Sequence, residues 1–396
     1  MKIKGLQFQA EFQPKKDYTP TQREIALQMA LCGNKIWHNP SLQLVEKDVR
    51  ELTEKEVLIK IGACGVCGSD VHFLGADADN YVPYTGHCAA GTIIGHEYSG
   101  EVVAVGKKVT GVSVGDLVVA ETMNWCGECD PCRMGMVNQC QNLEELGFTR
   151  DGGFADYMIA EEKFCYQVND FVDIYGSKEE ALEVAALIEP TSVAYNGMIA
   201  TAGGFRPGAY VAVTGAGPVG LAAVAIAKTA GAAKVFAIDL FDDRLEMAKQ
   251  MGADMVLNPK RLAETGQTAS EVLLGATGGV GIMMHVEATG AFRFTIPEIQ
   301  KSLAVGAKVC QIGLGSTEAP IFPQYFQTNS AVYSGSMGGS GHGVWPDIIR
   351  LISGGRLDLS PMIGGRYRLD DVLEALEVSR KGAPGKIIVT PHWLRK

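Results

Sequence analysis

The stretch YVAVTGAGPVGLAAVAIAKTAG, Tyr210–Gly231, joins an apolar strand pattern, a glycine-rich turn and an apolar helix pattern. Gly215, Gly217 and Gly220 stand in G-x-G-x-x-G register, and the helix is expected from Val219 onward. Such a turn lets a pyrophosphate approach the helix N-terminus, whose free N–H groups and dipole favour anions. The strand before the turn and the helix after it make this a specific prediction of a dinucleotide-binding site.

The next apolar strand ends at Asp239, 24 positions after Gly215 (239 − 215 = 24) and close to the spacing of about 20 that this motif requires. A carboxylate there accepts hydrogen bonds from the adenosine ribose and repels a 2′-phosphate, so NAD is favoured over NADP. Arg244 is also compatible with a phosphate, but we expect it to lie along the adenine.

Strand and helix patterns alternate onward to about residue 336, which predicts a doubly wound parallel sheet of the α/β class. Further strands are expected to end near Gly290, Gly315 and Ser336. The carboxyl ends of such strands face the cofactor crevice, so residues at these ends are candidates for the nicotinamide half. The predicted cofactor-binding set is Gly215, Gly217, Pro218, Val219, Gly220, Asp239, Arg244, Ala288, Thr289, Gly313, Leu314 and Ser336.

The flanking sequence has a different pattern. Residues 40–165 carry short apolar alternations separated by glycines, which is typical of a β-rich, barrel-like lobe. The tail predicts two helices and a last strand that return to this lobe. Because 396 residues exceed what one core usually serves, two domains are expected. We place them at 1–190 together with 336–396, and at 191–335.

Composition narrows the class of protein. Apolar residues make up 46% and charged residues 20%, as in soluble globular proteins, and the net charge of −10 argues against a nucleic-acid partner. No uncharged apolar run reaches the roughly 18 residues that span a membrane. The opening MKIKGLQFQAEFQPKKDY lacks the apolar core of a secretory signal. We therefore expect a cytoplasmic protein whose thiols remain reduced.

The stretch WCGECDPCRMGMVNQC concentrates four of the ten cysteines at C-x2-C-x2-C-x7-C spacing: Cys126, Cys129, Cys132 and Cys140. A disulfide cluster, a redox C-x-x-C pair and a set of unrelated buried thiols are the alternatives. In a reducing compartment a tetrahedral all-thiolate zinc site is favoured. Because four protein ligands leave no open position, this zinc is predicted to be structural.

A second cluster, ACGVCGSDVH followed by GHEYSG, offers ligands for a catalytic zinc. Cys67 and His96 supply a thiolate and an imidazole, and the third ligand is Glu97 or Glu189; the sequence leaves both open. Asp70 is expected to accept the other ring N–H of His96. His87 stands in a similar Gly–His pair without an acidic follower and is not expected to be a ligand.

The order of these motifs resembles the zinc-containing medium-chain alcohol and polyol dehydrogenases along nearly the whole chain. The segments that carry the resemblance are CGVCGSDVH, GHE, the four-cysteine loop, EPTSVAYN, GAGPVG and GKIIVTP. The Glu189–Pro190 pair is similar to the sorbitol and threonine dehydrogenase branch. LGFTRDGGFADY and GGSGHGVWP resemble inositol- and inosose-oxidising enzymes. The resemblance implies a Rossmann nucleotide domain and a β-rich, GroES-like catalytic domain.

The resemblance also implies roles. Ser69 takes the proton of the substrate and His72 passes it to solvent, while a secondary alcohol of a polyol or cyclitol gives its hydride to NAD. Sugars, linear polyols, amino-acid alcohols and a net epimerisation through transient oxidation remain alternatives, as does a zinc-free reductase or binding module. Family members assemble as dimers or tetramers, so a homodimer or homotetramer is expected.

Two segments depart from the short members of the family, 19–40 and 75–91, and both are candidates to roof the substrate pocket. A polyol needs several hydrogen-bond partners. The polar side chains nominated for this are Asp77, Asp79, Asn80, Tyr81, Asn142, Glu144, Glu145 and His342.

Overall fold

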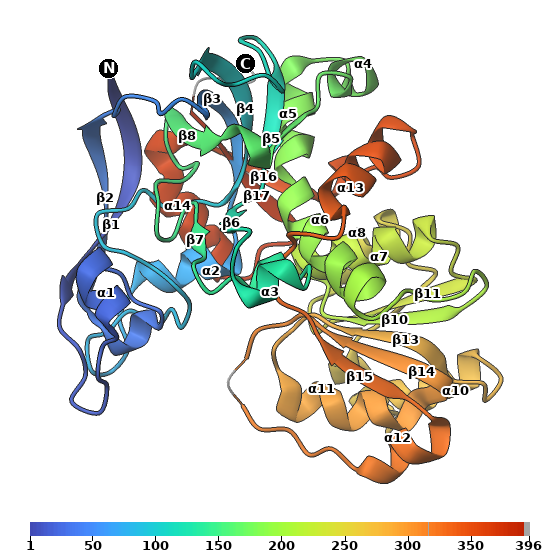
Figure 1. Ribbon diagram of the computed structural model, residues 1–396. Coiled ribbons are helices and arrows are strands. Elements are labelled where there is room, and N and C mark those ends of the chain that lie inside the picture. Colours follow the sequence, from blue (N-terminus) through green and yellow to red (C-terminus); the bar gives the residue numbers. More distant parts are fainter. Residues whose placement is uncertain (316, 392–396) are drawn as a thin grey trace. The chain divides into compact units, whose positions relative to one another are not determined.

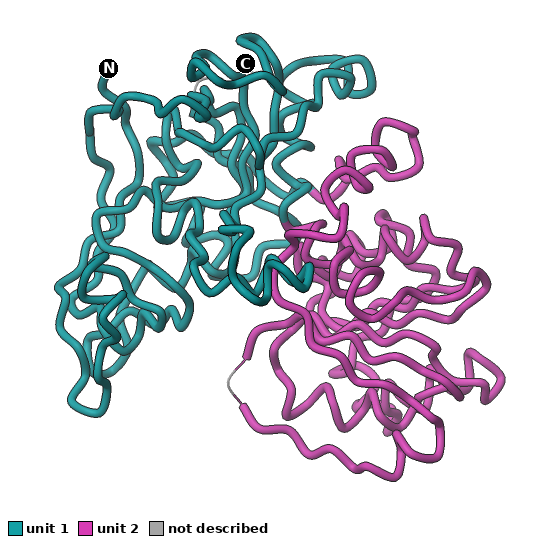
Figure 2. The backbone as a smooth tube through the Cα atoms, in the orientation of Figure 1, with its two compact units in different colours: residues 1–189, 363–396 teal, residues 190–362 magenta. Residues whose placement is uncertain are grey.

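The computed structural model describes residues 1–315 and 317–391. Its contacts divide the chain into two compact units (Figure 2). Unit 1 comprises residues 1–189 and the C-terminal segment from residue 363, and unit 2 comprises residues 190–362. Each unit is described by itself.

Unit 2 is built on a six-stranded, all-parallel sheet in the order β12-β11-β10-β13-β14-β15, with helices on both faces (Figure 1). The strands read as continuous apolar runs because both faces are covered, and Val211, Ala212 and Val213 are fully buried. The predicted doubly wound sheet is therefore confirmed. Its elements are α6 (Ile188–Tyr195, which begins in unit 1), a π-helical turn (Asn196–Thr201), β10 (Tyr210–Thr214), α7 (Pro218–Thr229), β11 (Lys234–Ile238), α8 (Asp242–Gln250), β12 (Met255–Leu257), α9 (Pro259–Glu264), α10 (Ala269–Ala276), β13 (Ile282–Glu287), α11 (Phe292–Ile299), β14 (Leu303–Gln311), α12 (Pro323–Asn329), β15 (Val332–Gly335) and α13 (Val344–Ser353).

Unit 1 contains a seven-stranded sheet in the order β16-β17-β3-β4-β5-β9, with β8 also paired to β3. The last predicted strand, β17, lies antiparallel to β3, so the tail returns to the first lobe. The elements are β1 (Lys2–Phe12), α1 (Gln22–Leu27), β2 (Trp37–Asp48), β3 (Glu56–Gly65), α2 (Gly68–Val71), β4 (Glu97–Val105), β5 (Leu117–Ala120), β6 (Met123–Asn124), α3 (Asp130–Arg133), β7 (Glu144–Glu145), β8 (Tyr157–Glu161), β9 (Cys165–Gln167), α4 (Phe171–Tyr175), α5 (Lys178–Ala186), β16 (Ile363–Arg368), α14 (Val372–Arg380) and β17 (Lys386–Thr390).

Residues 336–362 group by contact with unit 2, whereas the sequence prediction places them with the first lobe. Trp345 is buried and donates from Nε1 to the carbonyl oxygen of Gly339 at 3.1 Å. Thr229, at the end of α7, donates from Oγ1 to the carbonyl oxygen of Arg356 at 3.1 Å. The spacing of apolar residues in Val344–Ser353 predicts a helix. This spacing does not indicate against which of the two units the helix packs.

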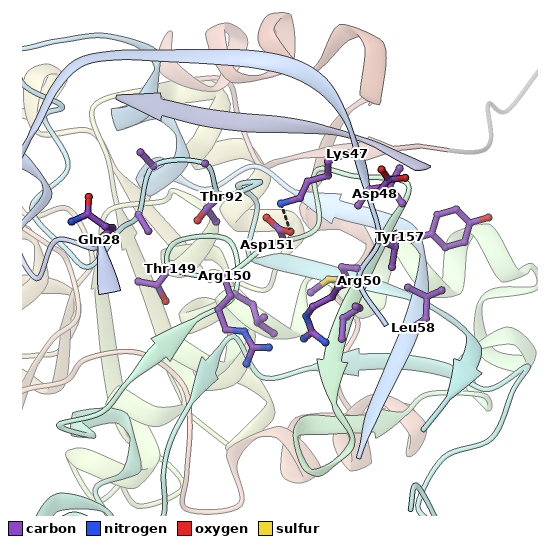
Figure 3. A pocket seen from close by; sticks show the side chains of 18 of the residues that line it. Gln28, Lys47, Asp48, Arg50, Leu58, Thr92, Thr149, Arg150, Asp151 and Tyr157 are labelled. Carbon is purple, nitrogen blue, oxygen red and sulfur yellow. Dashed lines mark hydrogen bonds and ion pairs between the residues drawn. The ribbon is translucent and has the colours of Figure 1, made fainter. Parts of the chain in front are cut away.

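A hollow of about 530 Å³ in unit 1 lies beneath the ribbon of β1 and β2 (Figure 3). It is lined by none of the predicted site residues, and its basic side chains Lys47, Arg50 and Arg150 are paired with carboxylates. Lys47 Nζ lies 2.7 Å from Asp151 Oδ2, and Arg50 donates from both terminal nitrogens to the buried carboxylate of Glu56 at 2.6 Å. The hydrogen bonds from Arg50 are the main reason that the pKa of the Glu56 carboxyl is lowered to about 2. These ion pairs connect the end of β2 to the seven-stranded sheet and to the loop that contains Asp151.

Among the described residues, the helices are all too short or too polar to cross a lipid bilayer.

Candidate functional site

The predicted catalytic ligands meet where β3 ends and β4 begins. Cys67 precedes α2, just after β3, and Glu97 opens β4 directly after His96. These two strands are antiparallel neighbours, and Gly65 is paired with Glu97. The pairing brings the ligand atoms of Cys67, His96 and Glu97 within 4.8 Å of one another.

Asp70 holds two of these ligand residues in place. Its Oδ2 accepts a hydrogen bond from the backbone N–H of Cys67 at 2.9 Å, and its Oδ1 lies 3.4 Å from Nδ1 of His96. The carboxylate is fully buried. A carboxylate beside one ring nitrogen leaves the other nitrogen for a metal, which is the arrangement that orients histidine ligands in zinc proteins.

Glu97 is held by Lys386, a residue that the sequence analysis did not single out. Lys386 Nζ donates to Glu97 Oε1 at 2.6 Å and to the carbonyl oxygen of Val66 at 2.9 Å, and both charged side chains are 1% exposed. Glu97 Oε2 is buried without a hydrogen bond in the described chain. An unsatisfied carboxylate oxygen beside a thiol and an imidazole fits a divalent zinc ion.

Glu189, the other candidate for third ligand, lies at the start of α6 and is half-buried. Burial raises the pKa of its carboxyl to about 7, with Glu97 acting in the same direction and His96 against it. Its carboxylate is therefore within electrostatic range of the cluster. Within the described chain, however, the carboxylate that lies within 4.8 Å of both Cys67 and His96 belongs to Glu97.

The four sulfur atoms of Cys126, Cys129, Cys132 and Cys140 also converge within 4.8 Å of one another. Cys140 Sγ lies 3.5 Å from Cys126 Sγ and 3.8 Å from Cys129 Sγ, far beyond the roughly 2.05 Å of a disulfide bond. Backbone N–H groups point at the sulfurs, and the hydrogen bond from Glu128 is the main cause that lowers the pKa of Cys126 to about 6. This donor set fits a closed zinc site.

The two predicted proton carriers lie in adjoining turns of one segment. Ser69 is half-buried in α2, and His72 is exposed in the short 3-10 turn that follows. The His72 ring centroid lies 6.5 Å from that of Tyr84. An exposed imidazole at this position can exchange protons with solvent.

In unit 2, the three motif glycines have three different surroundings. Gly215 has a φ of 99°, which favours glycine. A Cβ at Gly220 would lie 1.7 Å from the carbonyl oxygen of Gly215, so helix α7 approaches the turn too closely for a side chain. A Cβ at Gly217 would meet nothing within 4 Å, which leaves open space at the N-terminus of α7, where Pro218 and Val219 begin the helix.

Asp239 follows β11 and is held against the glycine turn. Its Oδ2 accepts from the N–H of Ala216 at 2.7 Å and its Oδ1 from the N–H of Phe241 at 3.0 Å. Arg244 lies 4.0 Å from the same carboxylate, and its guanidinium stands over the Phe241 ring at 5.1 Å. These residues line a hollow of about 690 Å³ that reaches Leu273 of α10. The hollow has the size and apolar character of a small-molecule site.

The remaining cofactor candidates lie, as predicted, after the carboxyl ends of β13, β14 and β15: Ala288, Thr289, Gly313, Leu314 and Ser336. Sequence reasoning missed the residue that shapes the first of these loops, Glu287. Its buried carboxylate accepts from the N–H groups of Thr289 and Gly290, each at 3.2 Å. Ser336 Oγ accepts from the Asn196 side chain at 3.2 Å, whereas Leu314 is 71% exposed.

The segments 19–40 and 75–91, which depart from the short family members, are joined to each other in unit 1. Ala30 and Cys88 form an antiparallel bridge, and Asn34 donates its N–H to the carbonyl oxygen of Tyr84 at 2.8 Å. The Tyr84 ring stacks on Phe148 at 5.1 Å. Four of the eight nominated polar residues lie in segment 75–91, and Asp77 serves the scaffold: it accepts from the N–H groups of Asp79 and Tyr81 and pairs with Lys15.

Two family models cover both halves of the chain. Residues 53–170 match the alcohol dehydrogenase GroES-like domain, and residues 218–354 match the zinc-binding dehydrogenase domain. The chain belongs to the zinc-binding alcohol dehydrogenase family and is an oxidoreductase whose cofactors are zinc and a nicotinamide dinucleotide.

Individual relatives are similar over almost the full length. Scyllo-inosose 3-dehydrogenase of Thermotoga maritima is 34% identical over 95% of this chain and 96% of its own. L-threonine 3-dehydrogenase of Caldanaerobacter subterraneus is 32% identical over 90% of this chain and 97% of its own. A solved structure of a protein assigned as an alcohol dehydrogenase in Thermotoga maritima has a TM-score of 0.93 at 33% identity, covering 98% of this chain and all of that chain.

Proposed function

We propose that the chain oxidises a secondary alcohol of a cyclitol or related polyol and transfers the hydride to NAD. The observation that carries this proposal is the convergence of Cys67, His96 and Glu97, three ligands of which the carboxylate has a buried, unsatisfied oxygen. Three protein ligands leave one position for a substrate oxygen, as catalytic zinc sites do. The 34% identity to a scyllo-inosose 3-dehydrogenase supports the substrate class.

The side chains of unit 1 have separate tasks in this proposal. Cys67, His96 and Glu97 would hold zinc, whose Lewis acidity favours ionisation of the alcohol while the nicotinamide accepts the hydride. Asp70 orients His96, and Lys386 holds the Glu97 carboxylate in place by a hydrogen bond. Ser69 Oγ accepts the hydroxyl proton as it gives up its own proton, and the exposed His72 imidazole transfers a proton to water.

A second candidate is oxidation of L-threonine, because the relatives include L-threonine 3-dehydrogenases at 30–33% identity. The two candidates differ in the charge of the substrate. An amino acid carries an ammonium and a carboxylate, whereas a cyclitol is neutral and offers several hydroxyls.

A substrate panel tests the proposal. With myo-inositol, scyllo-inositol, sorbitol, glucose and L-threonine, we expect the highest kcat/KM for a cyclitol or polyol, read as NADH absorbance, and about two zinc ions per chain by mass spectrometry. Preference for L-threonine, or less than one zinc per chain, contradicts the proposal. Steady NADH accumulation also distinguishes oxidation from a net epimerisation, which regenerates NAD.

We propose that Asp239 sets the preference for NAD. In Asp239→Ala, the ratio of kcat/KM for NAD over NADP should fall by about tenfold or more, because the carboxylate that repels a 2′-phosphate is gone and Arg244 remains. Steady-state kinetics with both cofactors measure the ratio. The control is Asp243→Ala, an exposed acid in α8 that should leave the ratio unchanged. An unchanged ratio in Asp239→Ala contradicts the assignment.

A further inference from the structure

A histidine–carboxylate pair in unit 1 has no part in the zinc sites. His87 Nδ1 lies 3.4 Å from Glu145 Oε2, with side chains 28% and 13% exposed. The His87 Nδ1 atom is itself buried and, in the described part of the chain, makes no hydrogen bond. The Nδ1 atom thus faces Glu145, while both side chains remain partly exposed and close enough together to contact one ligand.

Glu145 lies in a segment that packs against His96, a predicted zinc ligand. Glu145 ends β7 and begins a tight turn in which a Cβ at Gly147 would lie 2.5 Å from the carbonyl oxygen of Gly95 and 3.1 Å from Cβ of His96. The Phe148 ring in the same turn lies 4.5 Å from the His96 imidazole. Glu145 is therefore carried by a rigid turn in contact with a predicted ligand of the catalytic zinc.

The His87 side belongs to the segment 75–91. Tyr84, three residues before His87, stacks on Phe148 with an interplanar angle of 7°. Cys88 follows His87 directly. Its carbonyl oxygen accepts hydrogen bonds from Trp37 Nε1 at 3.0 Å and from the N–H of Ala30 at 2.8 Å. The ring sequence His96–Phe148–Tyr84 thus connects the ligand cluster to the segment that carries His87. Both members of the pair are held on well-packed backbone.

We propose that His87 and Glu145 together bind a hydroxyl of the substrate other than the one that is oxidised. A carboxylate accepts hydrogen bonds from one or two hydroxyls, and the imidazole supplies a second polar contact at the same place. L-threonine has no hydroxyl besides the one that is oxidised, so the pair favours a polyhydroxylated ring over L-threonine. This inference rests on the proposed function and names the feature that would set its substrate class.

The test compares substrates with and without the second hydroxyl. In Glu145→Gln and in His87→Leu, kcat/KM for myo-inositol and scyllo-inositol should fall about 10- to 100-fold, the effect of losing a charged hydrogen bond. Cyclohexanol has one hydroxyl, and its kcat/KM should stay within about twofold of wild type. The unit offers a matched control, because Glu11 forms a similar pair with His38 at 3.7 Å. Glu11→Gln should leave both values unchanged.

A binding measurement gives a readout that does not depend on turnover. Titration of myo-inositol into the NADH-bound protein by calorimetry should show an affinity weakened about 10- to 100-fold in Glu145→Gln and unchanged in Glu11→Gln. Equal loss of kcat/KM for inositols and cyclohexanol, or no loss for either, overturns the inference while the proposed dehydrogenase activity stands. A wild-type protein that forms no NADH with any of these alcohols contradicts both.

Discussion

Replacing Cys67 by alanine should lower kcat for alcohol oxidation by about a thousandfold or more, while the affinity for NAD stays within about threefold of wild type. Cys67 lies beyond the end of β3 in unit 1 and shares its ligand cluster with His96 and Glu97. The predicted cofactor contacts lie in unit 2, which has its own core around the parallel sheet. Loss of the thiolate removes Lewis acidity at the substrate without touching the nucleotide site.

Three measurements check this result: NADH formation, NADH binding by fluorescence titration, and zinc content. Zinc should fall from about two to about one per chain. Cys165→Ala is a control, because this half-buried thiol of β9 belongs to neither zinc cluster and should leave activity intact. Parallel loss of turnover and NADH affinity in Cys67→Ala would show that the metal and nucleotide sites are misassigned.

Replacing Lys386 by methionine should lower the free energy of unfolding by about 3–5 kcal/mol, the usual cost of leaving a buried charge without its partner. The side chains of Lys386 and Glu97 are each 1% exposed, and the hydrogen bond between them is 2.6 Å long. Methionine fills a similar volume, so the loss is chiefly electrostatic. Urea denaturation followed by circular dichroism measures the change.

A double-variant cycle separates charge from packing in this prediction. Measured on the metal-free protein, adding Glu97→Gln to Lys386→Met should restore part of the lost stability, because the remaining buried group is then neutral. Lys381→Met, an exposed lysine at the end of α14, should change stability by less than about 0.5 kcal/mol. A Lys386→Met protein as stable as Lys381→Met would contradict the role given to the pair.

The dinucleotide stretch could be predicted closely because its signals are local. The turn needs glycine at Gly215 and Gly220 for reasons set by residues a few positions away, and helix α7 begins within one residue of the expected start. The four-cysteine loop is similar, since its sulfurs converge through short spacings. Both features depend on neighbouring residues, which is the information that a sequence pattern contains.

Features that depend on distant residues were missed or left open. Lys386 and Glu97 are 289 positions apart, so no spacing predicts their ion pair. Strand β16 carries two glycines and was not predicted; pairing with β17 forms it. The Gly–His pair alone does not predict a role for His87. The proposed role depends on its contact with Glu145, which lies 58 positions later (145 − 87 = 58).

The sequence by itself determined the parallel-sheet class of unit 2, the glycine turn and its acid at Asp239, and the residue types of the two predicted groups of zinc ligands. Only the tertiary structure decided which carboxylate reaches Cys67 and His96, which core receives residues 336–362, and which polar side chains stand beside the ligands. The reason is physical: turns and helix starts are set by short-range sterics, whereas a buried charge takes its partner from whichever distant strand the sheet places next to it.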